Sequence, residues 1–171
     1  LTDDDDDSSS VVATPVDTTP PVITIVGDNP ATVELGTTYS DAGATATDTS
    51  YASGAVTVVT SGSVDTSTVG SYTLTYTATD AAGNTSTATR TVNVVDTTSP
   101  AITVTGGTPT SAELGSTYND AGATASDASG SIAVTSSGTV DTSTLGSYTI
   151  SYTATDASGN TGTATRTVNA V

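Results

Sequence analysis

The chain has 171 residues, which suits one ordinary domain or two small ones, and its formal charge at pH 7 is −16, because 18 acidic side chains outnumber two basic ones. A chain with this charge cannot neutralise a phosphate backbone or an anionic lipid surface, so nucleic acids and anionic membranes are excluded as partners. Cys and His are absent, which excludes disulfides, thiolate chemistry and Ser-His or Cys-His catalytic pairs.

The first 16 residues differ from the rest of the chain. They combine a run of five aspartates with a short apolar stretch that contains Val11, Val12 and Val16. We expect an extended, solvated tail, because acidic low-complexity sequence buries little apolar surface. The apolar stretch has the length of a β-strand that adds to an open sheet edge of another copy, so the tail is a candidate for head-to-tail assembly.

The remainder consists of two copies of one repeat. The sequence DTTPPVITIVGDNPATVELGTTYSDAGATATD begins at Asp17, and DTTSPAITVTGGTPTSAELGSTYNDAGATASD begins at Asp96. The second halves of the copies match as closely, so self-similarity is the dominant signal in the chain. We expect one domain over residues 17–95 and another over residues 96–171, joined by a short, semi-rigid connector.

Alternation of apolar and hydroxyl side chains predicts short strands in each repeat. In the first repeat, the predicted strands are Val22–Val26, Thr32–Leu35, Ala44–Thr47, Val56–Thr60, Ser71–Thr79 and Thr85–Val95. Between the last two, Asp80 to Asn84 is a predicted turn, because Asp and Asn cap turns and the intervening Gly accepts a positive φ. No segment shows the 3.6-residue period of a helix. About seven short strands per repeat indicate a β-sandwich.

The order V-E-L-G-x-x-Y-x-D-x-G-A-x-A-x-D, then V-D-T-S-x-x-G-x-Y, then Y-x-A-x-D-x-x-G-N and R-T-V resembles the immunoglobulin-like repeats of bacterial surface adhesins and secreted multidomain proteins. The resemblance implies an all-β fold: two tandem immunoglobulin-like β-sandwiches behind an extended acidic tail. It also implies a tyrosine corner at Tyr72 and at Tyr148, with Leu74 and Ile150 at the positions of the immunoglobulin cysteines.

Each repeat has one Glu and one Arg, and we expect them to pair. In an immunoglobulin-type sandwich the second half of the first strand lies beside the last strand, so Glu34 can reach Arg90, and Glu113 can reach Arg166. An exposed pair of this kind stabilises a fold by less than about 1 kcal/mol. Arg90 shares the parity of Val92, so either a bulge redirects it or its stem packs over a Tyr while its head reaches solvent.

The aspartates are the candidate metal ligands. The predicted strand order brings Asp48 and Asp80 to the end of the first domain where Asp17 enters, and the second domain repeats this arrangement next to the first. Carboxylate and amide oxygens are the ligands that calcium (Ca²⁺) prefers. The predicted Ca²⁺ site at the domain junction consists of Asp41, Asp65, Asp96, Asp127, Asp156 and Asn160. The alternative is that each of these residues caps its own turn.

These observations favour a non-catalytic structural or interaction protein, because paired carboxylates for glycoside hydrolysis need aromatic platforms and the chain lacks Trp and Phe. We expect a stalk, adhesin repeat or extracellular fibre subunit, secreted or on the cell surface, whose partners are other copies, neighbouring immunoglobulin-like domains or a surface protein. The acidic tail also resembles the tether behind the lipidated Cys of bacterial lipoproteins. The alternative is an accessory glycan- or polymer-binding module of a secreted enzyme, with Tyr51 as its stacking residue.

Overall fold

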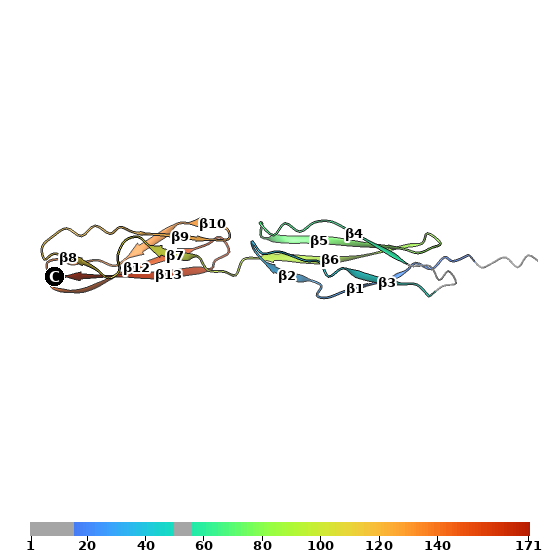
Figure 1. Ribbon diagram of the computed structural model, residues 1–171, viewed down its shortest axis with the longest axis horizontal. Helices are drawn as coiled ribbons and strands as arrows, with labels where there is room; N and C mark the ends of the chain where they lie inside the picture. The colour runs from blue at the N-terminus through green and yellow to red at the C-terminus, as the bar shows by residue number, and fades with distance from the viewer. Residues whose placement is uncertain (1–15, 50–55) are drawn as a thin grey trace, which may run out of the picture. The chain divides into compact units, whose positions relative to one another are not determined.

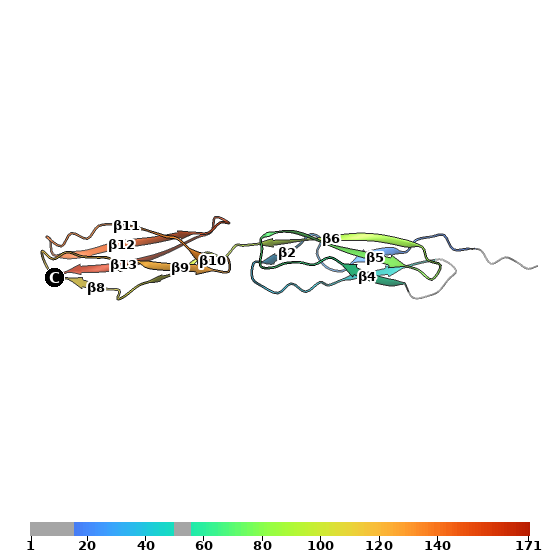
Figure 2. The same cartoon turned by 90° about the horizontal axis from the view of Figure 1, so that it is seen from above.

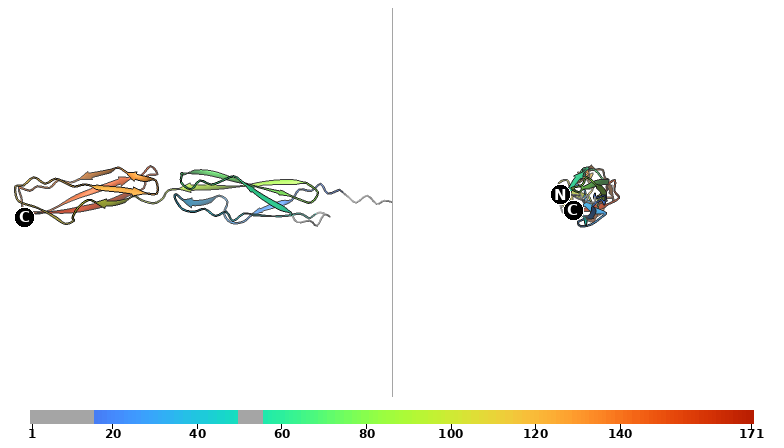
Figure 3. Two further views of the ribbon diagram at one scale, coloured as in Figure 1. Left: turned by 45° about the horizontal axis from the view of Figure 1, so that its top comes forward. Right: turned by 90° about the vertical axis from the view of Figure 1, so that its right-hand side faces the viewer.

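The computed structural model describes residues 16–49 and 56–171, and this part of the chain consists of strands and loops without a helix (Figures 1 and 3). The first repeat contains β1 (Val22–Ile25), β2 (Ala31–Glu34), β3 (Ala44–Thr47), β4 (Thr57–Ser61), β5 (Gly70–Thr79) and β6 (Thr85–Val95). These strands agree with the predicted ones to within one residue at each end. Residues 16–49 and 56–171 contain no apolar helix of the length that a membrane span requires.

The first repeat has two sheets. One has the strand order β2-β6-β5-β4, and the other pairs β1 with β3. The chain therefore changes sheet between β1 and β2. After this change β2 runs parallel to β6, with Ala31 opposite Val92 and Glu34 opposite Val95. This all-β, two-sheet arrangement is the predicted one.

The second repeat follows the same plan. Its strands are β7 (Ala101–Val104), β8 (Thr110–Ala112), β9 (Ala123–Asp127), β10 (Gly130–Ile132), β11 (Val134–Ser137), β12 (Gly146–Thr155) and β13 (Thr161–Ala170). Figure 2 shows β11, β12, β13 and β8 side by side as one sheet, and the other sheet has the order β10-β9-β7. Here β8 runs parallel to β13, as β2 does to β6.

Contacts group the chain into two compact units, whose boundary crosses the first repeat. One unit comprises Pro30–Ser40, Val64–Tyr72 and Thr91–Val171. One end of the first repeat thus belongs to the same compact unit as the whole second repeat, and the rest of the first repeat belongs to the other unit.

The core of each repeat follows the two-residue period of its long strands. Leu74 and Tyr76 of β5 are buried, as are Ile150 and Tyr152 of β12, whereas Thr75 and Ser151, which lie between them, are only half-buried. Val92 of β6 is also completely buried. Burial of alternate residues gives each long strand one face in the core and one hydroxyl-rich face outside.

A tyrosine corner is present in both repeats, as predicted. The Tyr72 hydroxyl donates to the backbone oxygen of Thr68 at 2.9 Å, and the Tyr148 hydroxyl donates to that of Thr144 at 2.9 Å. In each case the tyrosine ties the start of a long strand to the loop before it.

Candidate functional site

The arginine of the first repeat lies in the core. Arg90 is 2% exposed, and its guanidinium lies 5.9 Å from the centre of the Tyr76 ring. Its Nε lies 3.5 Å from Oδ1 of Asp41, and its Nη2 donates to the backbone oxygens of Val26 and Gly43. The Tyr76 hydroxyl donates to the same Asp41 oxygen at 2.7 Å. The charge of this buried arginine is thus balanced inside the repeat.

The second repeat has the same cluster. Arg166 is 3% exposed, and its Nη1 lies 2.8 Å from Oδ1 of Asp120 and 3.2 Å from the Tyr118 hydroxyl. The Tyr152 hydroxyl donates to Asp120 at 2.7 Å. Burial, and next to it this hydrogen bond to a carboxylate, raises the pKa of Tyr152 to about 12.

The predicted Glu-Arg pairs are therefore corrected. Among the described residues Arg90 does not pair with Glu34, nor Arg166 with Glu113, because β2 and β6 pair only from Val92 onward and Arg90 lies before this segment. Each arginine instead meets an aspartate of the loop before β3 or β9. Arg90 does lie over a tyrosine, but it is the guanidinium and not the stem that is placed over the Tyr76 ring, and this head is buried rather than exposed. These clusters stabilise the core.

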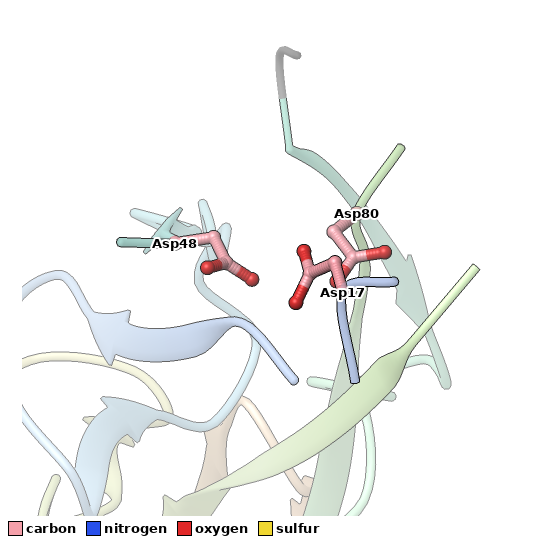
Figure 4. A group of neighbouring side chains, drawn as sticks. All are labelled: Asp17, Asp48 and Asp80. Atoms are coloured by element: carbon pink, nitrogen blue, oxygen red, sulfur yellow. The ribbon is translucent and has the colours of Figure 1, made fainter. Parts of the chain in front are cut away.

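A group of carboxylates occupies one end of the first repeat. Asp17 lies before β1, Asp48 follows β3 and Asp80 follows β5, and each has an oxygen within 4.8 Å of the others'. Figure 4 shows the three carboxyl groups turned toward one another. Three segments that are distant in the sequence thus place negative charge at one point.

The second repeat has a matching group. Asp96 precedes β7, Asp127 ends β9 and Asp156 follows β12, and oxygens of the three again lie within 4.8 Å of one another. Oδ1 of Asp127 accepts from the backbone and hydroxyl of Ser129, whereas its Oδ2 is buried and has no hydrogen-bond partner in the described part of the chain. We call these two groups the aspartate clusters.

Asn160 donates hydrogen bonds to two residues of the second cluster. Its Nδ2 donates to Oδ2 of Asp156 at 2.9 Å and to the backbone oxygen of Asp96 at 3.0 Å. A carbonyl oxygen can only accept, so the Asn160 amide presents nitrogen here and not the oxygen that the sequence suggested as a ligand. Burial raises the pKa of Asp156, but the hydrogen bonds from Asn160 and the following backbone outweigh it, so the pKa is lowered. Asn84 makes the corresponding bonds in the first repeat.

Two of the predicted metal ligands lie elsewhere. Asp41 belongs to the core cluster of the first repeat. Asp65 caps its own turn, because its Oδ1 accepts from the backbone of Ser67 at 2.9 Å and from its hydroxyl at 2.6 Å. Of the predicted ligands, the structure brings together Asp96, Asp127 and Asp156 beside Asn160. Binding of calcium itself stays a prediction. The recurrence of the same aspartates in both copies is the sequence signal for one cluster per repeat.

Comparison with known proteins agrees with this architecture. The family model described as "Bacterial surface protein, Ig-like domain" matches residues 23–94 and again residues 102–170. The chain belongs to this family. It is also 36% identical over 155 residues to hyalin of Strongylocentrotus purpuratus; the match covers 85% of this chain but only 13% of the length of hyalin.

Two solved structures are similar to this bacterial surface Ig-like chain. A lipoprotein from Bacteroides thetaiotaomicron shares 21% identity at a TM-score of 0.37, with 80% of this chain and 61% of the lipoprotein covered. The fibronectin(III)-like modules of CbhA from Clostridium thermocellum share 20% identity at a TM-score of 0.37, with 86% of this chain and 93% of the modules covered.

Proposed function

We propose that this chain is a non-catalytic repeat module of a bacterial cell-surface protein, such as a stalk or adhesin repeat, and that Ca²⁺ at the aspartate clusters holds its loops together. The observation that carries the proposal is the recurrence of the clusters. Each repeat gathers three aspartates within 4.8 Å: one from the segment before its first strand, and two from the ends of later strands or the loops that follow them. A cation there joins three segments of one repeat.

The chemistry of the clusters favours calcium over softer metals. All of their side-chain ligands are carboxylates, and Ca²⁺ prefers oxygen donors and accepts irregular geometry. Three negative charges at this spacing repel one another, and both arginines of the chain are held in the cores. The buried Oδ2 of Asp127, which has no hydrogen-bond donor among the described residues, gains a partner when a cation binds.

The distribution of tyrosines supports a spacer or assembly role. Each of the six tyrosines in residues 16–49 and 56–171 is buried or half-buried, so this part of the chain presents no exposed aromatic platform for sugar stacking. The alternative glycan-binding role depended on Tyr51, which lies outside the described residues.

Assembly through the tail is a further part of the proposal. Val16 is 84% exposed, while Val11 and Val12 lie outside the described residues. If the tail adds as a strand to another copy, deletion of residues 1–16 abolishes polymers in electron micrographs and leaves the two repeats folded. A full-length chain that stays monomeric at high concentration contradicts this assembly.

Calcium titration tests the central proposal. We expect millimolar Ca²⁺ to stabilise each repeat by about 1–3 kcal/mol relative to EDTA, measured as melting temperature and by calorimetric binding. Asp127→Asn and Asp48→Asn should each remove the response of one repeat. Asp65→Asn is the matched control, because this aspartate caps a turn outside the clusters, and it should retain the full response. Equal melting temperatures in calcium and EDTA, with no heat of binding, contradict the proposal.

A further inference from the structure

Glu34, at the end of β2, holds the segment that follows β6. Its Oε1 accepts from the backbone N–H of Thr97 at 2.8 Å and from the hydroxyl of Thr98 at 2.9 Å, and its Oε2 accepts from the Thr97 hydroxyl at 2.9 Å. These bonds, that from the Thr97 backbone above all, hold the pKa of Glu34 below its ordinary value. One carboxylate thus binds both threonines of an Asp-Thr-Thr segment.

The second repeat builds the same acceptor. The backbone N–H of Leu114 donates to the oxygen of Val171 at 2.8 Å, as that of Leu35 does to Val95 at 2.7 Å, and the turn after Glu113 closes in the same way as the turn after Glu34. The strand end that carries Glu113 therefore has the backbone arrangement that positions Glu34.

This strand end is more exposed in the second repeat. Leu35 is 5% exposed, whereas Leu114 is 53% exposed. Glu113 is also exposed, and its carboxylate, unlike that of Glu34, has no hydrogen-bond partner within residues 16–49 and 56–171. The second repeat therefore displays a carboxylate beside an apolar side chain at a position that is occupied in the first repeat.

The complementary donor is also displayed by this chain. In the first repeat the backbone N–H of Thr19 donates to Oδ1 of Asp17 at 2.9 Å, and in the second that of Thr98 donates to Oδ1 of Asp96 at 3.2 Å. Both Asp-Thr-Thr segments thus have the same local turn. Thr18 and Thr19 are exposed, as are the two threonines that bind Glu34.

We infer that Glu113 is the acceptor for an Asp-Thr-Thr segment that continues the polypeptide from Val171 into a further repeat of the same kind. The inference deepens the proposed function, on which it rests, by naming the partner of the second repeat. In the first repeat a single residue separates Val95 from Thr97, so continuation of the same chain delivers the donors to the carboxylate. The aspartate of the connector serves the cluster of the repeat that it begins, and the threonines bind the glutamate of the repeat before it.

An extended chain tests the inference. The full chain is lengthened after Val171 by Asp-Thr-Thr-Ser-Pro, a copy of residues 96–100, with Glu113 intact or as Glu113→Ala. Amide exchange at the first added threonine is followed by NMR, and we expect it to be roughly tenfold slower with Glu113 intact. An Asp-Ala-Ala-Ser-Pro extension, which lacks both hydroxyl donors, should lose part of this protection. Glu34→Ala, read at Thr97, is the matched reference in the first repeat.

Two outcomes overturn the inference. One is equal exchange at the added threonine with and without the Glu113 side chain. The other is self-association of the unextended chain that Glu113→Ala abolishes in sedimentation experiments, because the occupant is then a second copy. Neither outcome alters the calcium response of Asp127, so failure of this inference can be distinguished from failure of the proposed function.

Discussion

Aspartates occupy two contrasting surroundings in each repeat. Asp120 lies against Arg166 and accepts from the Tyr152 hydroxyl, so its charge is compensated within the protein. The aspartates of the cluster that contains Asp96 and Asp127 lie within 4.8 Å of one another, with the one arginine of their repeat in the core. The contrast teaches that the first arrangement is compensated by charges within the protein, whereas the second makes stability depend on added cations.

Removal of the core cation should have the largest effect. Arg166→Met leaves Asp120 without its cation, and we expect a loss of about 2–4 kcal/mol of unfolding free energy, since this carboxylate is still partly solvated. Urea denaturation followed by circular dichroism measures it. Asp120→Asn, which keeps an acceptor for the tyrosine but leaves the buried Arg166 without its carboxylate, should also destabilise the repeat. A loss below that of an exposed ion pair would show that the arginine is not compensated as described.

Loss of the tyrosine hydroxyl should have the next largest effect. Tyr152→Phe keeps the ring in the core but removes the donor to Asp120, and we expect a loss of about 1–3 kcal/mol. Tyr148→Phe is the matched comparison, because its hydroxyl bonds to a backbone oxygen nearer the surface. If Tyr152→Phe loses no more unfolding free energy than Tyr148→Phe, the hydrogen bond from Tyr152 to Asp120 contributes no more to stability than a tyrosine-corner hydrogen bond.

High pH should weaken the same cluster. The fold favours the neutral phenol of Tyr152, whose pKa is about 12 in the folded state against 10.0 ordinarily. Its contribution to stability is therefore complete below about pH 10 and is lost as the pH rises toward 12. Urea unfolding between pH 9 and pH 12, compared with Tyr152→Phe, isolates this contribution. An identical pH dependence in the variant would assign the alkaline loss to other groups.

Low pH should weaken the ends of the repeats by a smaller amount. Burial raises the pKa of Asp80 and of Asp156, but the hydrogen bonds from Asn84 and Asn160, together with those from the neighbouring backbone, outweigh it and lower both pKa values. A carboxyl group with a lowered pKa stabilises the folded state when the pH is above its ordinary pKa near 4, and this stabilisation is lost as the pH falls further. Melting temperatures measured in EDTA from pH 6 to pH 2 should fall less steeply in Asn160→Ala. If the melting temperature of this variant depends on pH as in the unmodified chain, Asn160 is not what lowers the pKa of the cluster.

The strands could be predicted from local alternation, the tyrosine corners from the family resemblance, and the convergence of aspartates from the expected strand order. The partner of Arg90 could not, since Asp41 lies in a loop to which strand periodicity does not apply. The two-residue period correctly placed Arg90 on the inner face. Its head was expected to be exposed because its buried acceptors, which are backbone oxygens and a loop carboxylate, cannot be recognised from the strand pattern. Similarly, the choice between donor and acceptor for Asn160 depends on which backbone oxygen lies opposite it, and no sequence pattern records this.

Burial of both arginines also determines how susceptible the chain is to trypsin-like proteases. Trypsin-like enzymes cut only after Lys or Arg, and the two such residues of this sequence, Arg90 and Arg166, are 2% and 3% exposed. The scissile bonds lie within β6 and β13, where pairing in the sheet and burial of the arginine keep them from the protease until the repeat opens. Each repeat thus contains a single internal cleavage site, and the rates of cutting at the two sites report separately how often each repeat unfolds.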